Sequence, residues 1–217
     1  MPSPAVIKIA SGLGALGMIG GGGIALYKSE LFKTKTTLGE LVRQDKWTLL
    51  NSSNTDQISK ILEAYKKSSP NKPTLLFPAF NGTENKAVEK LLEECQKASS
   101  KLSDDPDKDI FLRQIKKWCV VPKTVSQRLN DLGYKTLSTE APSGSTNEQS
   151  EWVEKGKSHH GTHDHKIKDI TTTGDQNNDA KVIREACKKK NETNSYDEDF
   201  DDALRASTLW CSVSTSK

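Results

Sequence analysis

The chain has 217 residues, of which 33% are apolar and 28% charged, and its mean hydropathy is −0.68. So few apolar residues exclude a large single core, and we expect a thin core with long polar connections. The formal net charge is only +3 and basic residues are scattered among acidic ones, which excludes the clustered basic face of a nucleic-acid-binding protein.

The amino-terminal segment is the most apolar part of the chain. The run from Ile9 to Tyr27 carries no charge, and as a helix it would extend roughly 28 Å, close to the hydrocarbon thickness of a bilayer. Its glycines at 20–23 are better tolerated in lipid than in water. We therefore predict a transmembrane anchor or uncleaved signal over residues 1–28 and a linker over 29–36.

Two other interpretations of this segment have less support. A cleaved signal peptide needs a small-x-small cleavage site, and we find no convincing one before Lys28. The run from Gly12 to Gly17 fits the G-x-G-x-x-G dinucleotide pattern. However, four glycines follow where that pattern needs a helix, and no second strand comes after them.

A Trp-Cys pair occurs twice, in Lys116–Val121 “KKWCVV” and in Thr208–Val213 “TLWCSV”, at an offset of ninety-two residues. Upstream the offset falls to eighty-seven, where Thr37-Leu38 faces Thr124-Val125, and an insertion in the loop at 138–146 explains the change. A fixed offset of this kind indicates a tandem duplication. We predict a first helical repeat domain over 37–123 and a second over 124–217.

Each copy is predicted to contain four helices, so the fold class is mainly α with at most short strands. In the first copy we expect helices near 38–44, 57–67 and 85–98, and a last helix with Asp105 as its N-cap. Asp197 is the corresponding cap in the second copy. The last helix of the first copy carries an apolar stripe formed by Ile110, Phe111, Ile115 and Trp118. The last helix of the second copy carries one formed by Phe200, Leu204 and Leu209.

The four cysteines fall in two equally spaced pairs, Cys95 with Cys119 and Cys187 with Cys211. The midpoint of each pair lies at or beside the turn between two helices, so each pair can meet across a helical hairpin. This favours one disulfide in each copy, with four reduced core thiols as the alternative. The neighbouring Trp118 and Trp210 are predicted to be buried structural anchors.

All four histidines lie in one short stretch, “SHHGTHDHK”, as His159, His160, His163 and His165. Such density makes them candidate metal ligands. However, Gly161 and Thr162 interrupt a helix there, and the aligned region of the first copy has no histidine. We therefore predict a solvated loop, no metal site and no cofactor.

The remaining patterns carry no catalytic signal. The aspartates of “DDPDKD” and “YDEDFDD” lack the glycine and glutamate of a calcium-binding EF-hand loop, and they are better placed to cap helices. No Ser-His-Asp or Cys-His arrangement can be identified with any specificity, and no phosphate-binding loop follows a strand. We expect a protein that is not an enzyme.

Three segments behind a Gly- and Ala-rich anchor resemble the large paralogous families of haemotropic mycoplasmas. They are Thr37–Ser53 “TLGELVRQDKWTLLNSS”, Trp118–Leu129 “WCVVPKTVSQRL” and Tyr196–Val213 “YDEDFDDALRASTLWCSV”. The resemblance implies a membrane-anchored, surface-exposed protein with a role in host interaction or antigenic variation. It transfers no catalytic residue to this chain, and the histidine cluster is not part of the shared pattern.

The side of the membrane on which the helical part lies is open to two interpretations. Lys28, Lys33 and Lys35 follow the predicted span, and the positive-inside rule then favours a cytoplasm-facing binding module. The paired cysteines favour an oxidising exterior. Together with the resemblance, they lead us to expect a single-pass protein with extracellular domains whose partners are the membrane and host surface components.

Overall fold

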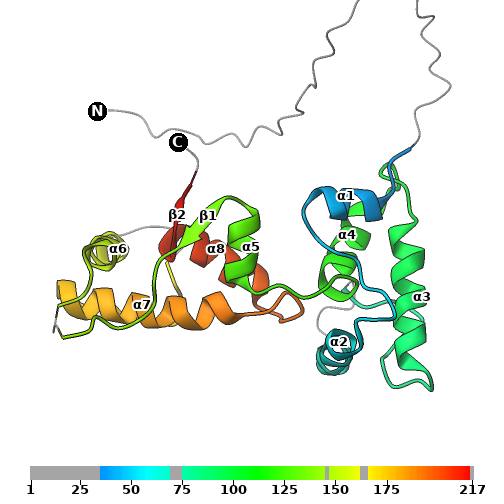
Figure 1. The fold of residues 1–217 in the computed structure, drawn as a ribbon, viewed down its shortest axis with the longest axis horizontal. Coiled ribbons are helices and arrows are strands. Elements are labelled where there is room, and N and C mark those ends of the chain that lie inside the picture. Colours follow the sequence, from blue (N-terminus) through cyan, green and yellow to red (C-terminus); the bar gives the residue numbers. More distant parts are fainter. Residues whose placement is uncertain (1–34, 69–74, 145–146, 162–165, 216–217) are drawn as a thin grey trace, which may run out of the picture. The chain divides into compact units, whose positions relative to one another are not determined.

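The computed structural model describes residues 35–68, 75–144, 147–161 and 166–215, and it groups Lys35–Lys217 into one compact unit. As predicted, the described residues are mainly helical, and their one sheet is the antiparallel pair β1–β2 (Figure 1). The elements in chain order are α1 Leu38–Gln44, α2 Thr55–Lys67, α3 Ala87–Ser99, α4 Lys108–Trp118, α5 Val125–Asp131, β1 Tyr134–Thr136, α6 Ser150–Gly161, α7 Gln176–Glu192, α8 Phe200–Trp210 and β2 Ser212–Ser214.

The predicted membrane anchor lies outside the described residues. Within the ranges that the structure covers, no helix has both the length and the apolar character that crossing a bilayer requires.

The two halves of the compact unit repeat the same backbone contacts at the sequence offsets of 87 and 92. The amide of Leu38 donates to the carbonyl of Lys101, and the amide of Val125 donates to that of Thr193. Two further backbone hydrogen bonds of the first half, from Leu50 to Cys119 and from Ser103 to Thr36, recur in the second as Leu137 to Cys211 and Ser195 to Lys123. The bridge between Leu49 and Val120 likewise recurs as the strand pair Thr136–Ser212. That the halves arose by duplication and act as separate domains remains a prediction.

The first helix of each half begins and ends with a defined capping motif. Thr37 and Thr124 both form capping boxes with the residue three positions later. In both helices the C-cap is followed by a residue of positive φ, Lys46 at 61° and Gly133 at 81°, where the chain turns away from the helix axis. Directly after Lys46, the backbone amide of Trp47 donates to the carbonyl of Val42 at 3.1 Å.

The last helix of each half starts two residues later than predicted. Asp107 and Asp199 occupy the N-cap positions of α4 and α8, without a capping side-chain bond, so the assignment of Asp105 and Asp197 as N-caps is wrong. The side chain of Asp105 instead accepts the amide of Asp107, and that of Asp197 accepts the amide of Asn194. Both carboxylates therefore order the turn before the helix.

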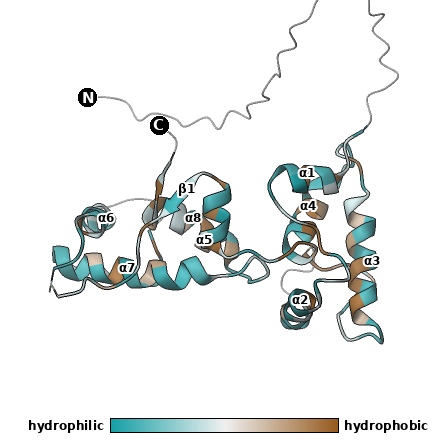
Figure 2. Cartoon of the chain, viewed as in Figure 1, coloured by the Kyte–Doolittle hydropathy of each residue, from teal (hydrophilic) through white to brown (hydrophobic). Residues whose placement is uncertain are grey.

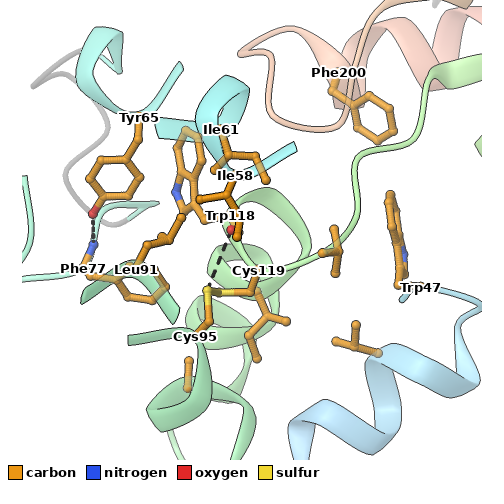
Figure 3. Close-up of a cluster of buried hydrophobic side chains, with 14 of the residues drawn as sticks. Trp47, Ile58, Ile61, Tyr65, Phe77, Leu91, Cys95, Trp118, Cys119 and Phe200 are labelled. Carbon is orange, nitrogen blue, oxygen red and sulfur yellow. Dashed lines mark hydrogen bonds between the residues drawn. A yellow bond between two sulfur atoms is a disulfide. The ribbon is translucent and has the colours of Figure 1, made fainter. Parts of the chain in front are cut away.

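The buried side chains form two clusters, and hydrophobic residues occupy short patches on otherwise hydrophilic helices (Figure 2). The first cluster surrounds Trp118 and crosses into the second half through Phe200 (Figure 3), whereas the second surrounds Trp152. The apolar stripe predicted for the last helix of the second half is only partly correct, because Leu209 is 44% exposed.

Candidate functional site

The candidate site is a pocket of about 440 Å³ between the two halves of the compact unit. Its size falls in the range of small-molecule sites, roughly 300–1,000 Å³. Apolar side chains from both halves line it together with basic and acidic ones. They are Trp47, Leu75, Phe200 and Leu204, then Arg113, Lys116, Lys117 and Arg128, then Asp197, Glu198 and Asp201.

Trp47 is the apolar centre of this junction. Its indole is buried, and the ring centroid lies 6.4 Å from that of Phe200 (Figure 3). Two cations lie over the ring: the guanidinium carbon of Arg128, from the second half, is 4.9 Å from its centroid, and the ammonium of Lys123, the last residue of the first half, is 5.6 Å from it. Cation–π attraction of this kind orients the indole between the halves.

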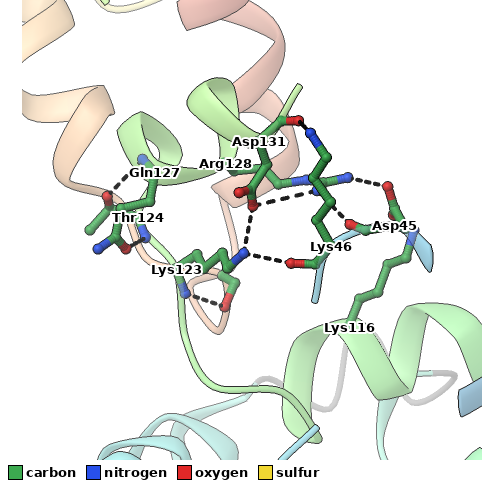
Figure 4. A network of polar contacts seen from close by, with 9 residues as sticks. Asp45, Lys46, Lys116, Lys123, Thr124, Gln127, Arg128 and Asp131 are labelled. Carbon is green, nitrogen blue, oxygen red and sulfur yellow. Dashed lines mark hydrogen bonds and ion pairs between the residues drawn. The ribbon is translucent and has the colours of Figure 1, made fainter. Parts of the chain in front are cut away.

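A polar network connects the halves through Asp45, Arg128 and Asp131 (Figure 4). Arg128 donates to the carboxylate of Asp45 at 2.5 Å and to its carbonyl at 2.8 Å, and Lys116 donates to the same carboxylate at 2.6 Å. Burial alone would raise the pKa of Asp45, but the hydrogen bonds from Lys116 and Arg128 outweigh it and lower that pKa. Asp45 is therefore held as an anion between two cations.

A second carboxylate extends the same network. Lys123 donates to Asp131 at 2.6 Å and to the carbonyl of Lys46 at 2.6 Å, while Lys46 donates to the carbonyl of Asp131 at 2.5 Å. The cations of this network therefore bind carboxylates and backbone carbonyls of the protein itself. The main effect of the network is to join the halves.

The chemistry that the pocket offers is binding. Arg113 is exposed and lines the pocket, and its Nε donates to the carbonyl of Asp109 in its own helix at 3.3 Å. Asp201 is exposed on the acidic side. A pocket lined by apolar side chains and by charges of both signs suits an amphipathic ligand.

The structure brings together the cysteines that the sequence paired. Disulfides join Cys95 to Cys119 and Cys187 to Cys211, with Cα–Cα distances of 5.3 and 5.4 Å. No cysteine is free. The prediction of one disulfide in each half is confirmed.

Both tryptophans beside these cysteines are buried. Trp118 donates from its indole to the carbonyl of Leu75 at 2.6 Å and meets the edge of Tyr65, whose ring is 4.8 Å away. Trp210 packs against the ring of His159, with centroids 4.9 Å apart. Each indole therefore contacts an earlier helix of its own half, α2 for Trp118 and α6 for Trp210.

The prediction of a solvated loop is wrong for His159 and His160. Helix α6 continues through Gly161, and His159 is buried, with its Nε2 accepting the amide of Ile167 at 3.0 Å. Burial, followed by the charge of Lys166, lowers the pKa of His159. Its buried Nδ1 has no hydrogen-bond partner among the described residues. Because the ring is buried and packs against Trp210, His159 is part of the core of the second half.

The other histidines do not complete a site. His163 and His165 lie outside the described residues, and His160 is 3.7 Å from the carboxylate of Asp179. In the part of the chain that the structure describes, no three His, Cys, Asp or Glu side chains are grouped so that they could hold a metal ion.

The junction residues were not predicted from the sequence, although one signal could have indicated them. At the offset of 87, Asp45 faces Leu132 and Arg128 faces Leu41. Both members of the ion pair are thus charged where their counterparts are apolar. A difference of this kind between two otherwise matching halves marks positions with a role specific to one half.

Comparisons with protein-family models, with curated proteins and with solved structures found no match to this chain.

Proposed function

We propose that this chain is a membrane-anchored surface protein that acts by binding and not by catalysis. In this proposal the compact unit Lys35–Lys217 lies outside the cell and contacts components of the host surface, with host interaction or antigenic variation as its role. The observation that carries the proposal is the pair of disulfides, because disulfides persist in oxidising surroundings and are rare in the cytosol.

The binding role is supported by the pocket at the junction. It offers the indole of Trp47 beside the ring of Phe200, and basic and acidic groups stand at its rim. Aromatic side chains next to fixed charges provide affinity and orientation without any reacting group.

A second candidate is a binding module that faces the cytoplasm. It is favoured by Lys28, Lys33 and Lys35, which follow the predicted span, because basic residues accumulate on the cytoplasmic side. In that location the four cysteines would be kept reduced.

The redox state of the cysteines in cells distinguishes the two locations. Cells quenched in acid and then alkylated with N-ethylmaleimide in denaturant, without reductant, should carry no label on the four cysteines, because all four are held in disulfides. The denaturant is needed because all four are buried in the folded chain. If the cysteines react under these conditions, the surface location is contradicted and the cytoplasm-facing module is supported. Protease treatment of intact cells gives an independent test, because protection of residues 37–217 would also contradict surface display.

A further inference from the structure

The contact between the two halves uses a different surface on each half. The first half contributes a set of residues that we call the tail face, namely Asp45, Lys46, Trp47 and Lys117. The second half contributes the head face, namely Arg128, Asp131, Asp197 and Phe200. Such a head-to-tail contact does not close on itself, since each half keeps one face unused.

The second half has its own counterpart of the tail face, and it is apolar. The counterparts of Asp45 and Lys117 are Leu132 and Leu209, which are both 44% exposed. The backbone supports this assignment, because Asp45 and Leu132 are both C-caps and each is followed by a residue of positive φ. Leu209 precedes the last residue of α8, as Lys117 does in α4.

The first half likewise has a counterpart of the head face. Leu41 occupies the position of Arg128, and Lys108 occupies that of Phe200. Leu41 is partly exposed and Lys108 is exposed.

These substitutions are complementary. The ion pair of Arg128 with Asp45 would be replaced by an apolar pair, Leu41 with Leu132. The aromatic pair of Phe200 with Trp47 would be replaced by Lys108 with Tyr134, and a lysine over a tyrosine ring is a cation–π pair. In these two pairs both partners have changed together, so the unused faces match each other at these positions. The pair of Lys117 with the carbonyl of Asp197 is not repeated, because Leu209 lies opposite Asp105, whose carboxylate already accepts the amide of Asp107.

We propose that copies of this chain associate head to tail, with the Leu41 face of one copy on the Leu132 and Leu209 face of the next. The contact is heterologous and open, so it builds short linear assemblies and not a two-fold dimer. Because few apolar side chains meet, we expect dissociation constants between about 1 µM and 1 mM. The inference depends only on contacts within residues 35–217 and is independent of the proposed location.

Cross-linking of the full chain in detergent tests the orientation. The native cysteines are all in disulfides, so cysteines introduced by Leu41→Cys and by Leu132→Cys supply the reactive thiols. Under mild oxidation a mixture of the two variants should form several-fold more covalent dimer than either variant alone. Glu89→Cys, on the exposed face of α3, is the matched control partner. The proposal would be overturned by equal yields of covalent dimer in the mixture, in each variant alone and in the control mixture.

A charge exchange tests the pairing of the two leucines. Leu132→Asp should raise the dissociation constant at least tenfold in sedimentation velocity, because an unpaired carboxylate would face Leu41. A mixture of Leu132→Asp with Leu41→Arg should recover open, linear association, because the introduced arginine meets the introduced aspartate at one contact and the unmodified Leu41 and Leu132 meet at the next. Association of Leu132→Asp equal to that of the unmodified chain, or an unmodified chain that stays monomeric up to about 1 mM, would refute the proposal.

Discussion

The guanidinium of Arg128 donates to the carboxylate of Asp45 across eighty-three residues of sequence, and it simultaneously covers the ring of Trp47. One side chain of the second half therefore satisfies both a charge and an aromatic face of the first. Since the first hydrophobic cluster also crosses this junction, the halves are expected to unfold together.

Removal of the Asp45 charge is the direct test of that coupling. Asp45→Asn leaves the mostly buried Arg128 with only the more distant carboxylate of Asp131, at 3.7 Å. We therefore expect the free energy of unfolding to fall by about 1–3 kcal/mol in urea titrations. The control is Asp104→Asn, which breaks the exposed pair with Lys35 and should change it by less than about 1 kcal/mol. Equal effects of the two substitutions would show that the junction contributes little.

The same carboxylate predicts a dependence on acid. Its pKa in the folded protein lies below the ordinary value of 3.8, so Asp45 binds protons less readily when folded than when unfolded. Its contribution to stability is complete above that ordinary value and is lost as the pH falls through the folded pKa. The difference in stability between the unmodified protein and Asp45→Asn should therefore shrink as urea titrations move from pH 6 to about pH 3. A constant difference would contradict this assignment.

His159 predicts a second, milder pH dependence. Burial and the neighbouring Lys166 lower its pKa, while the carboxylate of Asp179 opposes them. The neutral ring is thus favoured in the folded state, and stability should fall as the pH drops below the ordinary value of 6.5. His159→Gln should lessen the loss of stability between pH 7.5 and 5.5 in urea titrations. His160→Gln, at the exposed neighbour, should keep that loss, and identical pH profiles would exclude His159 as its source.

Local patterns predicted much of the fold. The helix predicted near 38–44 is observed as α1 over Leu38–Gln44, and the capping box of Thr37 begins it. The disulfides followed from the symmetry of a hairpin about its turn. The burial of His159 could not be predicted in this way, because its partner is the amide of Ile167, beyond the end of the helix. The junction, too, joins side chains such as Asp45 and Arg128 whose pairing no local period reveals.

The two disulfides should stabilise the protein to a similar extent. Both close rings of the same sequence separation, twenty-four residues, so loop closure predicts about 3 kcal/mol for each. Replacement of Cys187 and Cys211 together by alanine should lower the free energy of unfolding by about that amount, and so should the matching replacement of Cys95 and Cys119. Urea titration under non-reducing conditions measures both. A loss confined to one pair would mean that factors other than ring size dominate.

The closest approach of α6 to α7 depends on the absence of a side chain at Gly156. A Cβ there would lie 2.8 Å from the backbone nitrogen of Ala180 and 3.1 Å from the carbonyl carbon of Asp179, and backbone atoms cannot rotate out of the way. Trp152 and His159 lie about one turn to either side on the same buried face, so separating the helices would disturb both.

We therefore expect Gly156→Ala to lower the free energy of unfolding by about 1–3 kcal/mol, although alanine is the better helix former. Gly161→Ala is the matched control in the same helix, because no described atom lies within 4 Å of its Cβ position. It should leave stability unchanged or raise it by up to about 1 kcal/mol, through helix propensity alone. In urea titrations, the changes in the free energy of unfolding caused by the two substitutions should therefore differ in sign or by more than about 1 kcal/mol. If both glycines respond alike, the packing of α6 on α7 does not limit the stability of the second half.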